Sequence, residues 1–166
     1  MQGNFLRLAT RTVLVLFVCG IHVGIGLADE KSPAGARFIR VLDGSAIQDR
    51  QTGLIWEQEP DRFHGTWTEA AMHCKEKSIR GQTGWRIPGV KELSSLVDSS
   101  QRDPALPPGH PFSDVKSAIY WSGTPSATDD MVAWHVSFFT GEVVTDQKSQ
   151  TRRAWCVRDG LSGATQ

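Results

Sequence analysis

The amino-acid sequence predicts an α+β domain closed by one disulfide. Apolar residues with helical spacing lie in its first half, whereas alternating strand patterns dominate its last third. Two of its three cysteines, Cys74 and Cys156, lie beside tryptophans in patterned segments. An even number of cysteines in an exported chain is typical of a disulfide. We therefore expect the Cα atoms of this pair to lie about 4.4–6.8 Å apart.

The N-terminal segment is typical of a signal peptide. Two arginines precede an apolar run at 12–21, which contains the third cysteine, Cys19, and small residues at 26–28 suit cleavage. A retained membrane anchor is the alternative, because the apolar stretch continues beyond that run. We expect residues 1–28 to be removed on export to the periplasm or the cell surface, which leaves no membrane span.

Three parts follow the signal peptide: a flexible spacer at 29–37, a single domain at 38–160 and a frayed tail at 161–166. Lys and Arg number 18 and Asp and Glu also number 18, so the formal net charge is +0. This balance gives no general attraction to nucleic acid or to an anionic membrane. We expect neither as a partner.

The first part of the domain predicts short strands and then a helix. The strand candidates are residues 38–41, 46–48 and 54–56. A turn at 49–53 connects the last two. Thr66 and Glu69 have the spacing of a capping box, which predicts that a helix begins there. The residues that share its inward face are Trp67, Ala70, Ala71 and Cys74.

An extended piece precedes a second helix. Residues 85–88 end at a proline, which disfavours helix in the residue before it, and residues 89–97 carry apolar side chains with helical spacing. We expect Trp85 and Ile87 to be buried. We also expect Arg86 to be held by a carboxylate or by backbone carbonyls, because an unpaired charge among core residues is costly.

The rest of the domain is a long irregular segment followed by strands. Residues 98–117 hold four prolines, and ordered loops of that length are usually functional or covered. The expected strands are 119–122, 131–139 and 142–145, with 154–158 closing the sheet. The expected apolar face of the second strand is Val132, Trp134, Val136 and Phe138. Its expected wetter face is Ala133, His135, Ser137 and Phe139.

Seven motifs in this order resemble the Lcl C-terminal domain family, which is named after a collagen-like bacterial adhesin. They are Asp49-x-x-Thr52-Gly53-Leu54-Ile55-Trp56, Trp67-x-x-Ala70-x-x-x-Cys74, Gly84-Trp85-Arg86-Ile87-Pro88, Glu92-Leu93, Tyr120-Trp121-Ser122, Ala133-Trp134-x-Val136-x-Phe138-x-x-Gly141 and Cys156-Val157-Arg158. The resemblance covers residues 38–159. It implies a variant of the C-type-lectin-like fold, in which two helices flank small antiparallel sheets. It also implies a disulfide from helix to last strand, which matches Cys74 and Cys156.

The resemblance further implies bacterial surface or secreted proteins, a few of them adhesins for sulfated polysaccharide. No collagen-like repeat precedes the domain in this sequence, so we expect no trimerising stalk. The metal-holding signatures of calcium-dependent lectins are also missing, and Glu59-Pro60-Asp61 matches one of them only in part. Because the other aspartates are scattered, we expect no metal site.

No catalytic motif stands out. The sequence has no Gly-x-Ser-x-Gly, no His-Glu-x-x-His and no phosphate loop, and we expect Glu57 and Glu59 to be surface residues. The tryptophans expected in the core are Trp56, Trp67, Trp85, Trp134 and Trp155. The histidines expected to be isolated and to hold no metal are His64, His73, His110 and His135. We therefore expect a protein that is not an enzyme and has no cofactor.

The function that fits is an exported ligand-binding or adhesion module, which recognises a glycan or a protein through the loops at 98–118 and 123–131. A sulfated or carboxylated polymer suits their basic side chains, because guanidinium binds such anions in a bidentate manner. Those basic residues are Arg102, His110, Lys116, Lys148, Arg152 and Arg153. The residues expected to meet the ligand are Arg102, His110, Trp121 and Asp130. The alternative is an accessory subunit that docks onto another envelope protein, and an oxidase-like enzyme is the third possibility.

Overall fold

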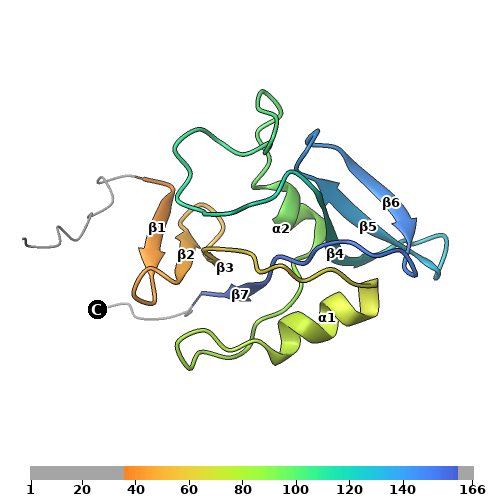
Figure 1. The fold of residues 1–166 in the computed structure, drawn as a ribbon, viewed down its shortest axis with the longest axis horizontal. Coiled ribbons are helices and arrows are strands. Elements are labelled where there is room, and N and C mark those ends of the chain that lie inside the picture. The colour runs from red at the N-terminus through yellow and green to blue at the C-terminus, as the bar shows by residue number, and fades with distance from the viewer. Residues whose placement is uncertain (1–35, 161–166) are drawn as a thin grey trace, which may run out of the picture. The chain divides into compact units, whose positions relative to one another are not determined.

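The computed structural model describes residues 36–160. The expected signal peptide at 1–28, most of the expected spacer and the tail at 161–166 lie outside these residues. Two helices and two small antiparallel sheets form the domain, which confirms the predicted α+β class (Figure 1). The elements are β1 (Phe38–Val41), β2 (Ala46–Asp49), β3 (Leu54–Glu57), α1 (Trp67–Glu76), α2 (Val90–Ser94), β4 (Ile119–Pro125), β5 (Val132–Ser137), β6 (Val143–Gln147) and β7 (Val157–Asp159). Within residues 36–160, neither helix has the length and apolar composition that a membrane span requires.

The first sheet has the strand order β1-β2-β3-β7, and all its neighbouring strands are antiparallel. The last strand of the domain lies beside β3, with Val157 opposite Trp56. The expectation that residues 154–158 close the sheet of the last third is therefore wrong. The chain before β7 touches β4 at one main-chain bridge, between Arg153 and Tyr120, and then crosses to β3. This segment therefore links the two sheets.

The turn between β2 and β3 is organised by the buried carboxylate of Asp49. It accepts hydrogen bonds from the main-chain N–H of Gln51 and the hydroxyl of Thr52, both at 3.0 Å. It also accepts two from the guanidinium of Arg37, at 3.0 and 2.8 Å. Burial alone raises the pKa of Asp49, but these bonds outweigh it and lower the pKa below its usual 3.8. Gly53 completes the turn with a left-handed φ of 76°.

The first helix begins as its capping motif predicts. The carboxylate of Glu69 accepts hydrogen bonds from the main-chain N–H of Thr66 at 2.8 Å and from its hydroxyl at 2.7 Å. The buried residues of α1 are Ala70 and Cys74. The second helix is shorter than expected, with five residues, although Leu96 just beyond its end is fully buried.

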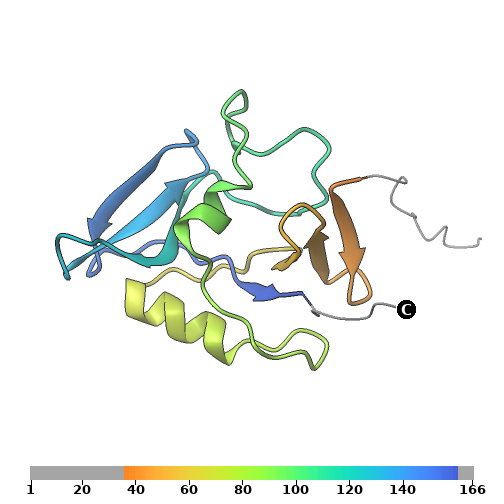
Figure 2. The same ribbon diagram turned by 180° about the vertical axis from the view of Figure 1, so that it is seen from behind.

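The second sheet has the order β4-β5-β6 and lies between the two helices (Figures 1 and 2). Leu93 of α2 belongs to the same core cluster as Tyr120 of β4. Ala70 of α1 belongs to a different core cluster with the next residue of β4, Trp121. Adjacent side chains of a strand point to opposite faces. The two helices therefore cover opposite faces of this sheet.

This two-sided cover overturns the prediction of a wetter face on β5. Ala133, His135 and Ser137 are 0%, 4% and 8% exposed. Ala133 packs in the same cluster as Ala70 of α1, so the helix covers the face that alternation assigned to water. The periodicity of one strand carries no information about such a second layer. On the expected apolar face, the side chains that are only half-buried are Val132 and Trp134.

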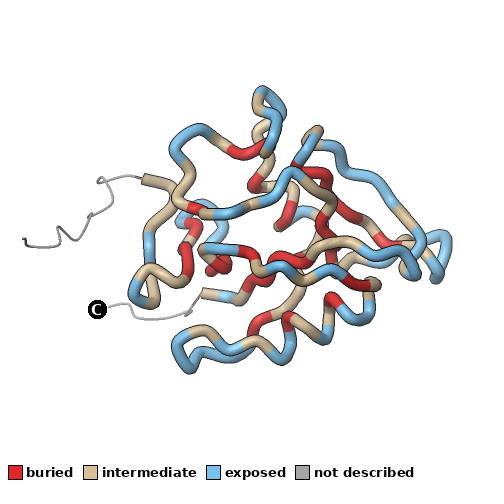
Figure 3. The backbone as a smooth tube through the Cα atoms, in the orientation of Figure 1, coloured by how far each residue is buried: buried red, intermediate tan, exposed pale blue. Residues whose placement is uncertain are grey.

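The core contains most of the tryptophans. The fully or almost fully buried ones are Trp56, Trp85, Trp121 and Trp155, and Figure 3 shows buried stretches in both sheets and on one side of α1. The prediction that Trp134 is a core residue is wrong, because it is half-buried, whereas Trp67 is half-buried but packs against the second cluster. Ile87 is also half-buried instead of buried, although it packs against the second cluster.

The irregular segment at 98–117 covers part of the core. Ala105, Leu106 and Phe112 are buried within it. The main-chain N–H of Ala105 donates to the carbonyl of Phe138 at 2.7 Å, which fastens the segment to the end of β5. Much of this segment therefore serves packing, and only its remaining side chains are available to a partner.

Candidate functional site

A buried disulfide joins α1 to the chain before β7. The Cα atoms of Cys74 and Cys156 lie 5.3 Å apart and their sulfurs are bonded, so the predicted pairing is confirmed. Both residues are 0% exposed. Because a thiol or disulfide must be reached to react, neither sulfur is available to a reactant while the domain is folded.

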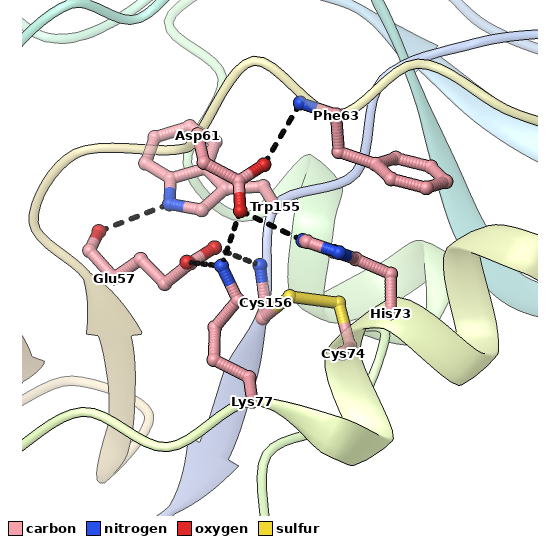
Figure 4. Close-up of a disulfide and its surroundings, with 8 residues drawn as sticks. All are labelled: Glu57, Asp61, Phe63, His73, Cys74, Lys77, Trp155 and Cys156. Carbon is pink, nitrogen blue, oxygen red and sulfur yellow. Dashed lines mark hydrogen bonds and ion pairs between the residues drawn. A yellow bond between two sulfur atoms is a disulfide. The ribbon is translucent and has the colours of Figure 1, made fainter.

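Four ionisable side chains surround this disulfide (Figure 4). The Lys77 Nζ atom contacts the carboxylate of Glu57 and lies 2.7 Å from Oδ2 of Asp61. His73 Nε2 lies 2.8 Å from the same Asp61 oxygen. The ring of His73 stacks on Phe63, with ring centroids 4.4 Å apart. The ammonium group of Lys77 thus connects the end of α1 with the end of β3 and the turn that follows it.

The environment of this cluster changes the pKa values of its members. Burial raises the pKa of Glu57, and the nearby ammonium of Lys77 does not cancel that effect. Burial also raises the pKa of Asp61, but hydrogen bonds from Lys77 and from the main-chain N–H of Phe63 outweigh it, so the pKa is lowered. Burial lowers the pKa of Lys77, but its two carboxylate partners more than compensate and raise it. Lys77 therefore remains a cation between two acids.

Two sequence expectations are corrected here. Glu57 was expected at the surface, but its side chain is 4% exposed, and its second oxygen accepts the main-chain N–H of Cys156 at 2.7 Å. His73 was expected to be isolated, but it faces the carboxylate of Asp61. The ammonium of Lys77 is already satisfied by its partners. The arrangement therefore suits a structural link around the disulfide better than a reactive centre.

The residues expected to bind a ligand lie at separate places. The guanidinium of Arg102 donates to the carbonyl of Thr140 at 2.9 Å, so it ties the long loop to the turn after β5. Asp130 is exposed, and its carbonyl accepts a hydrogen bond from Lys148 Nζ at 2.7 Å. These contacts place Arg102 and Asp130 beside different parts of the second sheet.

His110 and Trp121 are less accessible. His110 is half-buried with its ring centroid 5.9 Å from that of Phe112, and burial lowers the pKa of His110. Trp121 is 0% exposed, and its indole N–H donates to the carbonyl of Gly65 at 3.3 Å. Trp121 has no surface with which to contact a ligand, so the expectation for this residue is wrong.

Three cations act on the exposed carboxylate of Asp114: Lys116, which pairs with it, and Arg62 and Arg153, whose charges lower its pKa. We call this group the Asp114 cluster. A hydrogen bond from Lys116 is the main cause that lowers the pKa of Asp114. The positive charges of Lys116, Arg62 and Arg153 lower it further. Two of these cations were among the basic residues singled out in the sequence. Arg62 was missed, because it precedes α1 and no local pattern connects it with the later loops.

The extended chain before β7 brings the Asp114 cluster together. On one side of this extended chain, Arg152 exchanges main-chain hydrogen bonds with Gly65 at 3.0 and 2.9 Å, and Gly65 belongs to the same segment as Arg62. The N–H of Arg153 donates to the carbonyl of Ile119 at 3.0 Å, on the side of the chain that carries the long loop. Successive side chains of an extended segment point in opposite directions. Arg152 accordingly pairs with a different carboxylate, on β6.

The cluster has more positive than negative groups. Among the ion pairs of residues 36–160, none includes Arg62 or Arg153. Glu59 reaches the edge of the cluster because its carboxylate accepts the hydroxyl of Ser113 at 2.9 Å. With Glu59 at its edge, the cluster thus contains three cations and two carboxylates. The two arginines have donors to offer to an external anion.

The part of the chain that the structure describes contains no group of three or more His, Cys, Asp or Glu side chains placed to hold a metal ion. A small α+β domain with a buried disulfide and an exposed cationic cluster is the class of protein that these features define. A family model described as the Lcl C-terminal domain matches residues 45–158. The chain belongs to this family, and membership suggests a bacterial extracellular or adhesin-like module. No curated protein matches the chain.

Proposed function

We propose that this protein is a non-catalytic binding module of the bacterial cell envelope, and that it recognises a sulfated or carboxylated polymer. The observation that carries the proposal is the Asp114 cluster, in which Arg62 and Arg153 have no carboxylate partner of their own in residues 36–160. A guanidinium group binds the oxygens of a sulfate or carboxylate in a bidentate manner. Lys116 adds a third positive charge that a repeating polyanion can meet.

The exposure of these groups supports the same function. Arg62 and Lys116 are exposed and Arg153 is half-buried, so an extended polymer can reach all three without a deep pocket. The main chain of Arg153 is hydrogen-bonded on the side of β4, which holds this side chain on a rigid support. The buried acid Glu57 is saturated by its partners, which is consistent with a protein that binds without catalysing a reaction.

Heparin is the sulfated probe for this proposal, and polygalacturonate is the carboxylated one. We expect the double variant Arg62→Gln/Arg153→Gln to bind about a hundredfold more weakly or worse, because each of the two lost charge-assisted contacts contributes about 1.5–3 kcal/mol. The matched control is Arg40→Gln/Arg50→Gln, which removes two exposed arginines elsewhere and the same net charge. Its affinity should stay close to that of the natural protein.

Salt adds a second measurement to this experiment. The affinity of the natural protein should fall as salt rises, and the double variant should lose part of that dependence. Equal weakening by both double variants would show that net charge alone drives binding, which contradicts a defined site. If the natural protein binds neither polymer but co-purifies with an envelope protein, the accessory-subunit alternative is correct instead.

Two finer features belong to the same proposal. We propose that the domain is a variant of the C-type-lectin-like fold, which the pair of helices and the link from α1 to the last strand support. We also propose that the chain is exported, with cleavage after Ala28, as the N-terminal pattern indicates. Sequencing the N-terminus of the protein recovered from the periplasm or the medium tests export. A start at Met1 contradicts it.

A further inference from the structure

The strand β6 is the open edge of the second sheet. It lies last in the order β4-β5-β6, and Figures 1 and 2 both show it on the outer side of β5. Its Val143 and Val144 are 37% and 46% exposed. Natural edge strands are commonly protected by a proline, a bulge or a covering segment. β6 has no proline, and its pairing with β5 runs without a register shift.

The hydrogen bonds with β5 show which main-chain groups of β6 are free. The carbonyl of Glu142 accepts the N–H of Ser137 at 2.9 Å, and the N–H of Lys148 bonds to the chain before β5 at 2.8 Å. Residues of an antiparallel strand alternate between hydrogen-bonded and non-hydrogen-bonded pairs. The main-chain groups of Val143 and Thr145 therefore point away from β5, toward the open edge.

The open edge is short because its far end is already closed. The N–H of Gln147 also points outward, but it donates to the Asp146 side chain at 2.8 Å. The carbonyl of Gln147 accepts the N–H of Gln150 at 2.9 Å. Among residues 36–160, four outward groups of the strand have no partner, which are the N–H and the carbonyl of Val143 and of Thr145.

We propose that β6 pairs with β6 of a second copy of this chain, in an antiparallel arrangement whose twofold axis passes through Val144. This register places Val143 opposite Thr145 of the second copy, and Thr145 opposite Val143 of the second copy. Four hydrogen bonds then use all four free groups. The two Val144 side chains meet as a non-hydrogen-bonded pair, which is the closest approach that an antiparallel ladder allows.

The rest of the sheet limits this pairing to two copies. The other edge strand, β4, is bridged by the chain before β7 between Tyr120 and Arg153, so it offers no equivalent edge. A twofold contact that uses one edge of each copy closes on itself. Glu142 then lies opposite Asp146 of the second copy, but Asp146 is already neutralised by Arg152. The contact is small, so we infer a weak dimer that forms at high protein concentration.

Sedimentation velocity of the purified protein, from micromolar to millimolar concentration, tests the dimer. We expect the natural protein to shift from monomer to dimer over this range. Thr145→Pro removes an outward N–H that the pairing with β5 does not use, so this variant should fold and remain a monomer. The matched control Thr145→Val keeps the main chain intact and should dimerise. A natural protein that stays monomeric at the highest concentration overturns the proposal.

Cysteine mapping tests the register and does not depend on the proline variant. Under mild oxidation Val144→Cys should form a dimer disulfide, because the Cα atoms of a non-hydrogen-bonded pair lie about 4.5 Å apart. Gln147→Cys is the matched control on the same strand, and it lies away from the axis, so it should cross-link far more slowly. Equal cross-linking of the two variants, or faster cross-linking of the control, overturns the pairing around Val144.

Discussion

The two terminal nitrogens of Arg86 lie 2.7 and 2.8 Å from the two carboxylate oxygens of Glu92. This confirms the expectation that a carboxylate holds Arg86. One of those nitrogens also lies 2.8 Å from Asp159 of β7, and a Glu92 oxygen accepts the main-chain N–H of Gly89 at 2.7 Å. The pair therefore links the start of α2 to β7, the last strand of the first sheet.

Replacing Arg86 with lysine should destabilise the domain modestly. An ammonium cannot reproduce the bidentate contact, and both side chains are partly exposed, so we expect a loss of about 1 kcal/mol in the free energy of unfolding. Urea denaturation measures this loss. Arg80→Lys is the control, because Arg80 lies 3.8 Å from Asp43 and is more exposed. Equal stability of the Arg86→Lys variant and the natural protein would show that the link is not strengthened by its geometry.

Removing the Lys77 cation from the group of charges around the disulfide should lower the stability of the domain by more than the Arg86 substitution does. Lys77→Met leaves the carboxylate of Glu57 buried without a positive partner, and we expect a loss of about 3 kcal/mol. The double variant Lys77→Met/Glu57→Gln removes both charges and should recover part of that loss. Denaturation of Lys77→Met, Glu57→Gln and the double variant, together with the natural protein, forms a double-mutant cycle. If the double variant is as unstable as the sum of the single variants, the two side chains are not coupled.

The same cluster predicts a pH effect in the Lys77→Met variant. Burial raises the pKa of Glu57 in the folded protein above its usual 4.5. Folding therefore takes up a proton at pH values between the pKa of the unfolded chain and the higher pKa of the folded protein. The contribution of this group to stability is thus present below pH 4.5 and lost as pH rises through the folded pKa. Relative to the natural protein, Lys77→Met should be least affected in mild acid and most affected at neutral pH. A deficit that is independent of pH contradicts this assignment.

His135 predicts the opposite pH dependence. Its Nδ1 atom is buried and has no hydrogen-bond partner among residues 36–160. Burial lowers the pKa of His135 below its usual 6.5, with the charge of Asp146 opposing and that of Arg152 reinforcing the shift. The unfolded chain therefore binds more protons below pH 6.5, and stability is lost as pH falls through the folded pKa. His135→Gln should reduce the slope of stability between neutral pH and pH 5, by at most about 1.4 kcal/mol per pH unit. His64→Gln, at an exposed position, should leave the slope unchanged.

Loss of the disulfide should also lower stability strongly. We expect Cys74→Ala/Cys156→Ala to lose about 2–5 kcal/mol, because the bridge restricts the unfolded chain. Both cysteines are fully buried, so reductant should act on the natural protein only when the domain opens. Thiol labelling in reductant, with and without low urea, measures this. Rapid labelling without urea would contradict the burial of the sulfurs.

The features that the sequence predicts well are those with local signals. The capping pair Thr66 and Glu69 marks the start of α1, and the tryptophan-flanked cysteines indicate their own pairing. The features it does not predict depend on contacts between distant residues. The burial of Glu57 follows from a bond to the main chain of Cys156, 99 positions away. No pattern within a single element carries that information.

The candidate site divides in the same way. Lys116 and Arg153 lie in segments that the sequence marks as loops, so composition alone identifies them as basic candidates. Their meeting with Arg62 depends on the chain before β7, which runs between Gly65 and β4. Trp121 shows the reverse error, because its position before a loop suggested exposure while a helix in fact covers it.

The covalent bridge between Cys74 and Cys156 also determines how the domain carries mechanical load. A force that pulls on both ends of the domain passes through the sulfurs, so the main chain between the two cysteines, with a sequence separation of 82, cannot be drawn out. The whole β4-β5-β6 sheet and two cations of the Asp114 cluster, Lys116 and Arg153, lie within that shielded loop. Arg62 lies on the loaded side. Tension that peels the chain before α1 from the domain would therefore separate Arg62 from Lys116 and Arg153. The sheet that supports those two residues would stay intact. The cluster would thus weaken before the domain unfolds.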